Sequence, residues 1–225
     1  MRLFSAIAVF TAAAISNSHA GQLQSIKAFQ TLTPYQVVST EPRQWNTDLS
    51  FGQWHTASPQ QTPTSGFGLA ILGFPTNQQT QSYQFSVTDG QQWQYLECIG
   101  RNHLTKITQW PIKSNTGQKP ALACGIKGAT DNTFYLNPEW DQQFVGHSEL
   151  SDRTIKIRSL HQINRTAYPT LEPAGYLLTD EQGAIAQVEV LNKGRVWLRP
   201  NLSAQTQLEL AARITALLLF NPKNS

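Results

Sequence analysis

The chain has 225 residues, of which 40% are hydrophobic and only 14% are charged, and its formal net charge at pH 7 is +3. This balance excludes a nucleic-acid-binding domain, because such domains carry a strong excess of basic residues. The 6 Trp, 6 Tyr and 10 Phe residues are enough for a sizeable hydrophobic core, and the 14 Gly and 12 Pro residues indicate many turns.

Residues 1–20 have the three parts of a secretory signal peptide: a basic start, an apolar stretch over residues 3–15, and a polar end with small residues at Ser18 and Ala20. The apolar stretch would form a helix of roughly 20 Å, too short for a hydrocarbon core of ~30 Å. We therefore predict cleavage before Gly21 and a periplasmic or secreted protein with no transmembrane span. The alternative is a buried N-terminal helix.

The next segment, residues 21–65, is rich in Gln, Thr, Ser and Pro but also carries many aromatic residues. Aromatic residues at that density are rarely left in a disordered tail. We predict an irregular N-terminal segment with one or two short strands, packed on the main body. Its last part, residues 57–65 with Pro59 and Pro63, is predicted to be a loop.

Residues 66–225 are predicted to be one β domain with a C-terminal helix. Tyr83, Phe85 and Val87 alternate with polar residues, an Asp89–Gly90 turn follows, and a second apolar run covers residues 93–99. This pattern predicts a β-hairpin. Further short strands are predicted at 104–107, 121–126, 133–136, 154–157, 176–178, 185–191 and 195–198. Short strands separated by turns favour a mainly β fold, a single antiparallel barrel or sandwich.

The end of the chain changes to a helical period. Ser203 is a suitable N-cap for a helix that runs to about Phe220, shortly before a proline. Gln205, Glu209 and Arg213 lie four residues apart and predict a polar stripe. Beyond Arg213 the helix is apolar on all faces, which predicts that it is buried.

This order of elements resembles, in outline, the tubby and scramblase-like barrels. The resemblance covers roughly residues 66–220. It rests on the series of strands, on a faint similarity between the hairpins that hold Glu97 and Glu189, and on the apolar helix from Leu208 to Phe220. It implies a closed or nearly closed sheet that takes the helix into its interior. The signal peptide and a cysteine pair distinguish this chain from the family, and we carry over no site residues.

Cys98 and Cys124 are the 2 cysteines of the chain. In an oxidising compartment we predict a disulfide between them, and closing a loop of this length would contribute about 3.5 kcal/mol of stability. Two buried free thiols are the alternative. Because the histidines are scattered and no metal-binding spacing of Cys or His occurs, we expect no metal and no cofactor.

Charged residues are segregated around the cysteines. Between Ile99 and Lys127 all of them are basic: Arg101, Lys106, Lys113, Lys119 and Lys127. Between Gly128 and Asp152 all of them are acidic: Asp131, Glu139, Asp141, Glu149 and Asp152. One interpretation is a basic face that binds an anionic lipid headgroup or an acidic glycan of the cell envelope. The other is that the two segments are neighbours in the fold and neutralise one another.

Three shorter features could carry chemistry. Glu139 and Asp141 flank Trp140, but neighbouring carboxylates do not straddle a scissile sugar bond well, so we predict a solvated turn. The segment 146–150 begins like a nucleophile elbow but lacks its second glycine, and we predict a polar loop. Within 153–165, basic residues 156 and 158 share one strand face, which we interpret as a solvated outer face, with an anion-binding ridge as the alternative.

Without a catalytic constellation, the sequence favours a non-enzymatic exported β protein that binds or scaffolds a cell-envelope component. The first alternative is an exported hydrolase acting on an envelope glycan or ester. Such an enzyme would gather His147 or His161 with a carboxylate and a hydroxyl in a deep cleft. The second alternative is a secreted protein-binding inhibitor, which would present a flat, exposed aromatic patch.

Overall fold

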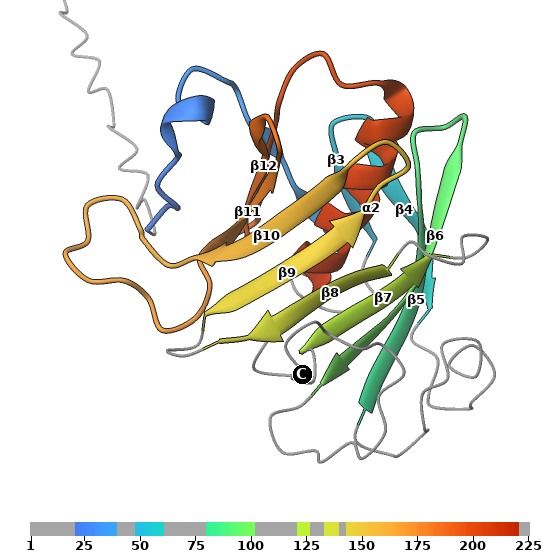
Figure 1. Ribbon diagram of the computed structural model, residues 1–225, viewed down its shortest axis with the longest axis horizontal. Helices are drawn as coiled ribbons and strands as arrows, with labels where there is room; N and C mark the ends of the chain where they lie inside the picture. The colour runs from blue at the N-terminus through green and yellow to red at the C-terminus, as the bar shows by residue number, and fades with distance from the viewer. Residues whose placement is uncertain are drawn as a thin grey trace, which may run out of the picture.

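The computed structural model describes residues 21–39, 48–60, 80–101, 121–126, 133–139 and 143–220. Its strands form one 13-stranded antiparallel sheet around a single long helix (Figure 1). The elements are η1 (Lys27–Phe29), β1 (Tyr35–Gln36), β2 (Val38–Ser39), β3 (Leu49–Phe51), β4 (Trp54–Gln60), β5 (Thr80–Thr88), β6 (Trp93–Arg101), β7 (Leu122–Ile126), β8 (Thr133–Pro138), β9 (Phe144–Glu149), β10 (Thr154–Leu160), β11 (Gly175–Asp180), β12 (Gly183–Glu189), β13 (Arg195–Leu198) and α2 (Ala204–Leu219). The predicted mainly β class is confirmed.

The sheet forms a nearly closed barrel because its first two strands occupy its two edges. β1 pairs with β13, whereas β2 pairs with β3 at the other end of the strand order. Only Val37 separates β1 from β2 in the chain, and its backbone N–H donates to the carbonyl of Gly194. One continuous segment thus joins both edges, which makes the fold a barrel and not a sandwich.

The predicted hairpin is present as β5 and β6, which pair along their whole length. Phe85 and Val87 point into the core, as their alternation with polar residues predicts. The turn is fixed by the Asp89 carboxylate, which accepts the backbone N–H groups of residues 91 and 92. Gly90 follows with φ at +91°, a conformation that favours glycine. Local turn chemistry therefore sets the register of this pair.

The helix α2 lies inside the barrel, where it contacts β4, β5, β6 and β12 (Figure 1). Ser203 caps it as predicted, since the Ser203 hydroxyl accepts the backbone N–H of Thr206 at 3.1 Å. Ile214 and Leu217 are completely buried in the main core. The prediction of a buried apolar helix is confirmed.

The predicted polar stripe on this helix is not a solvent-facing one. Gln205 is exposed, but Glu209 is only 3% exposed and Arg213 is 0% exposed. Glu209 meets the β9–β10 connection, whose Ser151 N–H donates to the Glu209 carboxylate at 2.8 Å, and Arg213 meets Ser148 and Glu149 of β9. Helical spacing predicts which residues lie on the stripe, but it does not predict which part of the fold the stripe packs against.

Two predicted loops contain strands. The segment 57–60 belongs to β4, and an irregularity in its pairing with β5 accommodates Pro59. The segment 146–149 belongs to β9, which pairs on both sides. Gly146 has a structural purpose there, because a Cβ atom at this position would lie 2.4 Å from the carbonyl oxygen of Tyr135. The absence of a side chain at Gly146 lets β8 and β9 approach each other closely.

Residues 21–32, which we call the N-terminal strap, cross the outer face of β11, β12 and β13. Phe29 packs there against Leu177 and Trp197 in a second, smaller apolar cluster. The backbone N–H of Leu23 donates to the Glu189 carboxylate and that of Ile26 to the Gln187 side chain, both at 3.0 Å. Two buried polar side chains of β12 thus substitute for strand pairing and fix the strap to the barrel.

Several predictions lie outside the described residues. They include the signal peptide at 1–20, the end of the predicted loop at 61–65, the strand at 104–107, and residues Trp140 and Asp141. Glu139 is exposed and follows β8 directly, with its backbone N–H bonded to the carbonyl of Gln143.

Candidate functional site

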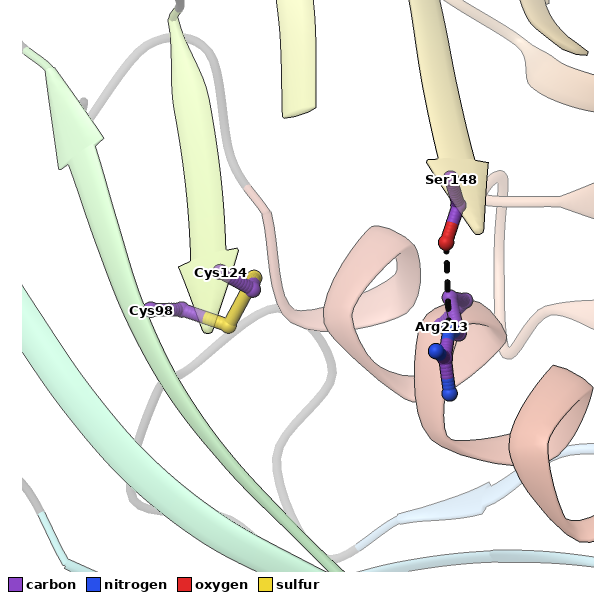
Figure 2. Close-up of a disulfide and its surroundings, with 4 residues drawn as sticks. All are labelled: Cys98, Cys124, Ser148 and Arg213. Carbon is purple, nitrogen blue, oxygen red and sulfur yellow. Dashed lines mark hydrogen bonds between the residues drawn. A yellow bond between two sulfur atoms is a disulfide. The ribbon is translucent and has the colours of Figure 1, made fainter. Parts of the chain in front are cut away.

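The predicted disulfide is present between Cys98 on β6 and Cys124 on β7. The two residues lie directly opposite each other, with their Cα atoms 4.0 Å apart, and both are fully buried in the barrel core. Figure 2 shows the bridge between the two neighbouring strands. The disulfide is closed to solvent, so we assign it a structural role. It joins β6 and β7, the strands before and after residues 102–120.

The predicted basic face cannot be located among the described residues. Lys106, Lys113, Lys119 and Lys127 lie outside them, and so does the side chain of Arg101, the last residue of β6. Two described members of the acidic segment, Glu149 and Asp152, have partners within the fold. Glu149 bonds to His147 and Thr154, and Asp152 bonds to Arg153 and Thr206.

Arg213 is a buried cation that connects the helix to the barrel wall. Its guanidinium donates to the Ser148 hydroxyl at 3.2 Å (Figure 2) and to the backbone carbonyls of Glu149 and Glu209, both at 3.0 Å. Burial lowers the pKa of Arg213 to about 10, while the nearby Glu209 carboxylate favours its charged form. Arg213 therefore keeps its charge at neutral pH in a structural position.

A second ionic cluster ties together three connections at one end of the barrel. Asp180, at the end of β11, accepts bonds from Arg153 at 3.1 Å and from Arg199 at 3.0 Å. The Asp180 side chain is only 4% exposed. Its bond to Arg199 holds the pKa of Asp180 below the usual range, despite burial. All its described partners are internal, so this cluster stabilises the fold.

A groove lies between the N-terminal strap and the end of β10. It has a volume of about 580 Å³. Its described lining residues are Leu23, Gln24, Ser25, Ile26, Lys27, Gln30, Gln143, Arg158, Ser159, Leu160, His161, Gln162 and Pro169. Two of these are cations, four are glutamines and none is a carboxylate. The groove is therefore positively charged and rich in hydrogen-bonding groups.

A chain of hydrogen bonds holds the part of the groove next to β10. His161 Nδ1 lies 2.8 Å from the backbone carbonyl oxygen of Thr170, and its Nε2 lies 2.9 Å from the hydroxyl of Ser159. The same hydroxyl accepts the backbone N–H of Phe144 at 2.9 Å. The Thr170 N–H in turn donates to the His161 carbonyl at 2.8 Å. Strand β10, strand β9 and the connection after β10 meet at this point.

His147 occupies a different environment on the outer face of β9. Its Nε2 lies 2.5 Å from a Glu149 carboxylate oxygen, and its ring lies 5.9 Å from that of Tyr135. The Thr154 hydroxyl donates to the second oxygen of Glu149 at 2.7 Å. Burial raises the pKa of Glu149, but these two bonds outweigh it and the net direction is downward. The hydroxyl bonds to the carboxylate and not to the histidine, so this cluster lacks the order of a catalytic triad.

The sequence predicted the exposure of one groove cation, Arg158, but not the groove itself. Strand alternation correctly placed Arg158 and Lys156 on an exposed face of β10. The sequence offers His161 only as one of two candidate histidines for a hydrolase. Lys27 and Gln143 carried no local signal, because they reach the groove only when the strap and β9 pack beside β10.

The described residues hold no group of three or more His, Cys, Asp or Glu side chains arranged to bind a metal ion. In the part of the chain that is described, no helix has the length and apolar character needed to cross a membrane. Comparisons with protein-family models, with curated proteins and with solved structures gave no match.

Proposed function

We propose that this chain is an exported β-barrel protein that binds an anionic component of the cell envelope in the groove beside β10. The observation that carries the proposal is the composition of the groove. Lys27 and Arg158 both line it, and no carboxylate occurs among its described lining residues. A concave surface of one charge sign attracts ligands of the opposite sign.

The two cations are held by rigid parts of the fold. Arg158 is paired on both sides within the sheet, opposite Val145 of β9 and Leu177 of β11. Lys27 lies in η1, directly after the strap residue that bonds to Gln187. The backbone positions of both cations are therefore fixed, by sheet pairing for Arg158 and by the bonds of the strap to β12 for Lys27. This favours a single binding surface over two unrelated surface cations.

The chemistry of the lining fits a carboxylate or phosphate group. Arginine presents a planar fork of donors to either group, and lysine adds a compact point charge. Glutamine amides beside them can bond to the hydroxyls of a sugar or glycerol unit. Both an acidic glycan and an anionic lipid headgroup have this chemistry. Export is proposed from the pattern of residues 1–20 and agrees with the use of a disulfide.

The experiment compares two charge-matched double variants of the protein that begins at Gly21. In Lys27→Gln/Arg158→Gln the groove loses both cations. In the control, Arg165→Gln/Lys193→Gln, two exposed cations outside the groove are removed. Retention is measured on immobilised heparin and on vesicles of phosphatidylglycerol at low salt. We expect the groove variant to bind about tenfold more weakly and the control to bind like the wild type.

The two surfaces distinguish the two sources of the anion. Loss on heparin alone identifies a glycan, and loss on vesicles alone identifies a lipid headgroup. Equal losses in both double variants would show that only net charge matters, and the groove proposal would then be abandoned. A triple variant, Lys106→Gln with Lys113→Gln and Lys119→Gln, measures how much of the retention depends on the basic segment that the sequence indicated.

A further inference from the structure

We propose that Ser159 and His161 form a nucleophile and general-base pair that cleaves a carboxylic ester bound in the groove. Both residues line the groove, and the Ser159 hydroxyl lies 2.9 Å from His161 Nε2. A nucleophile bonded to a histidine whose other nitrogen is held by a third group is the arrangement that activates serine for acyl transfer. This activity goes beyond the anion binding proposed above and uses the same groove.

The partner of His161 Nδ1 fixes the direction of the proton transfer. A backbone carbonyl can only accept a hydrogen bond, so the nitrogen that faces Thr170 at 2.8 Å must carry the proton. In the neutral ring Nε2 is then an acceptor. The Ser159 hydroxyl consequently donates to Nε2, as a serine must if the histidine is to remove its proton. The Thr170 carbonyl positions the ring in the way a carboxylate does in a triad.

Ser159 combines a fixed position with limited exposure. It lies near the end of β10 and is 8% exposed. Its oxygen accepts one bond, from the Phe144 N–H, and keeps a second lone pair for attack on a carbonyl carbon.

The proposed reaction needs only an ester and water. Ser159 Oγ forms a bond to the ester carbonyl carbon while its proton passes to His161 Nε2. The bond from that carbon to the alcohol oxygen then breaks, and the departing oxygen takes the proton from Nε2. Water repeats the two steps on the acyl-serine, which releases the carboxylic acid and restores the Ser159 hydroxyl.

The test uses an uncharged alkyl fluorophosphonate on the folded, disulfide-bonded protein that begins at Gly21. The serine oxygen displaces fluoride from phosphorus, its proton passes to the histidine, and the adduct is located by peptide mass spectrometry. We expect one adduct, on Ser159, and none after denaturation in urea. His161→Gln should slow labelling at least about 100-fold, in line with the loss of a general base.

Two matched controls separate catalysis from structure. Ser151→Ala removes an exposed serine outside the groove lining, and His147→Gln removes the histidine on β9; both should label like the wild type. If the folded wild type is not labelled at Ser159, the proposal is overturned, and the bonds of Ser159 and His161 serve only to pin the connection after β10. Because the probe is uncharged, this result does not depend on the anion-binding experiment.

Discussion

At the scale of single residues, Arg213 shows how a charge can be accommodated inside a barrel. The guanidinium is fully buried, yet the Ser148 hydroxyl and the carbonyls of Glu149 and Glu209 accept its hydrogen bonds. The Glu209 carboxylate supplies the opposite charge nearby and is itself bonded to Ser151 and Gln205. Three hydrogen-bond acceptors and a nearby carboxylate together compensate the charge of Arg213. The described contacts include no direct ion pair to it.

We expect Arg213→Met to lower the free energy of unfolding by about 3–5 kcal/mol, because it leaves a buried carboxylate without its counter-charge and removes three side-chain hydrogen bonds. Urea unfolding followed by tryptophan fluorescence measures the change. Arg165→Met removes an exposed arginine and should cost less than about 0.5 kcal/mol. Equal stabilities of the two variants would show that Arg213 is solvated and not buried.

At the scale of elements, the connections at one end of the barrel are joined by charge. Asp180 ends β11, Arg153 precedes β10 and Arg199 follows β13, so one carboxylate links three segments that are distant in the chain. A neighbouring bond from the Thr206 hydroxyl to Asp152 adds the first turn of α2 to the same end. These contacts hold the connections where hydrogen bonds of the sheet have ended.

The Asp180 contribution should depend on pH in a defined direction. Its pKa is lowered in the folded protein, so the stabilisation is complete above the pKa of the unfolded carboxyl, near 4, and is lost as the pH falls through the lower folded value. We expect Asp180→Asn to cost about 2 kcal/mol at pH 7 and progressively less below about pH 4. Thermal unfolding across this range measures it. A constant difference at all pH values would refute the assignment, and Glu181→Gln, an exposed neighbour, is the control.

At the scale of the whole molecule, the barrel is organised around its helix and closed by covalent and non-covalent links. The disulfide joins β6 to β7, and the segment that contains Val37 joins the two edges of the sheet. The groove lies outside this closed core, between the N-terminal strap and the end of β10. The proposed binding surface is thus separate from the disulfide-bridged core.

We expect the double variant Cys98→Ala/Cys124→Ala to lose about 3.5 kcal/mol of unfolding free energy, the value for closing a loop of this length. Its retention on heparin or anionic vesicles should remain that of the wild type, since the bridge faces the core. Chemical denaturation with and without reductant provides the measurement. Reductant should destabilise the wild type and leave the double variant unchanged; a further effect on the variant would contradict this explanation.

By itself, the sequence determined the features that depend on near neighbours in the chain. The alternation of Phe85 and Val87, the turn at Asp89 and the cap at Ser203 were predictable because each rests on contacts over a few residues. The burial of the helix was predictable because apolar side chains on every face leave no side for water. These patterns were sufficient for the mainly β class and for the order of most strands.

Only the tertiary structure decided which distant segments meet. Lys27 and Arg158 line one groove because the strap bonds to Gln187 and Glu189, and nothing local in the sequence indicates that contact. Glu209 and Arg213 form a polar stripe by their spacing, but only the fold shows that both are buried. The strand around Gly146 is stable because both neighbours pair with it. In each case the free energy comes from long-range hydrogen bonds and burial, which a local pattern does not encode.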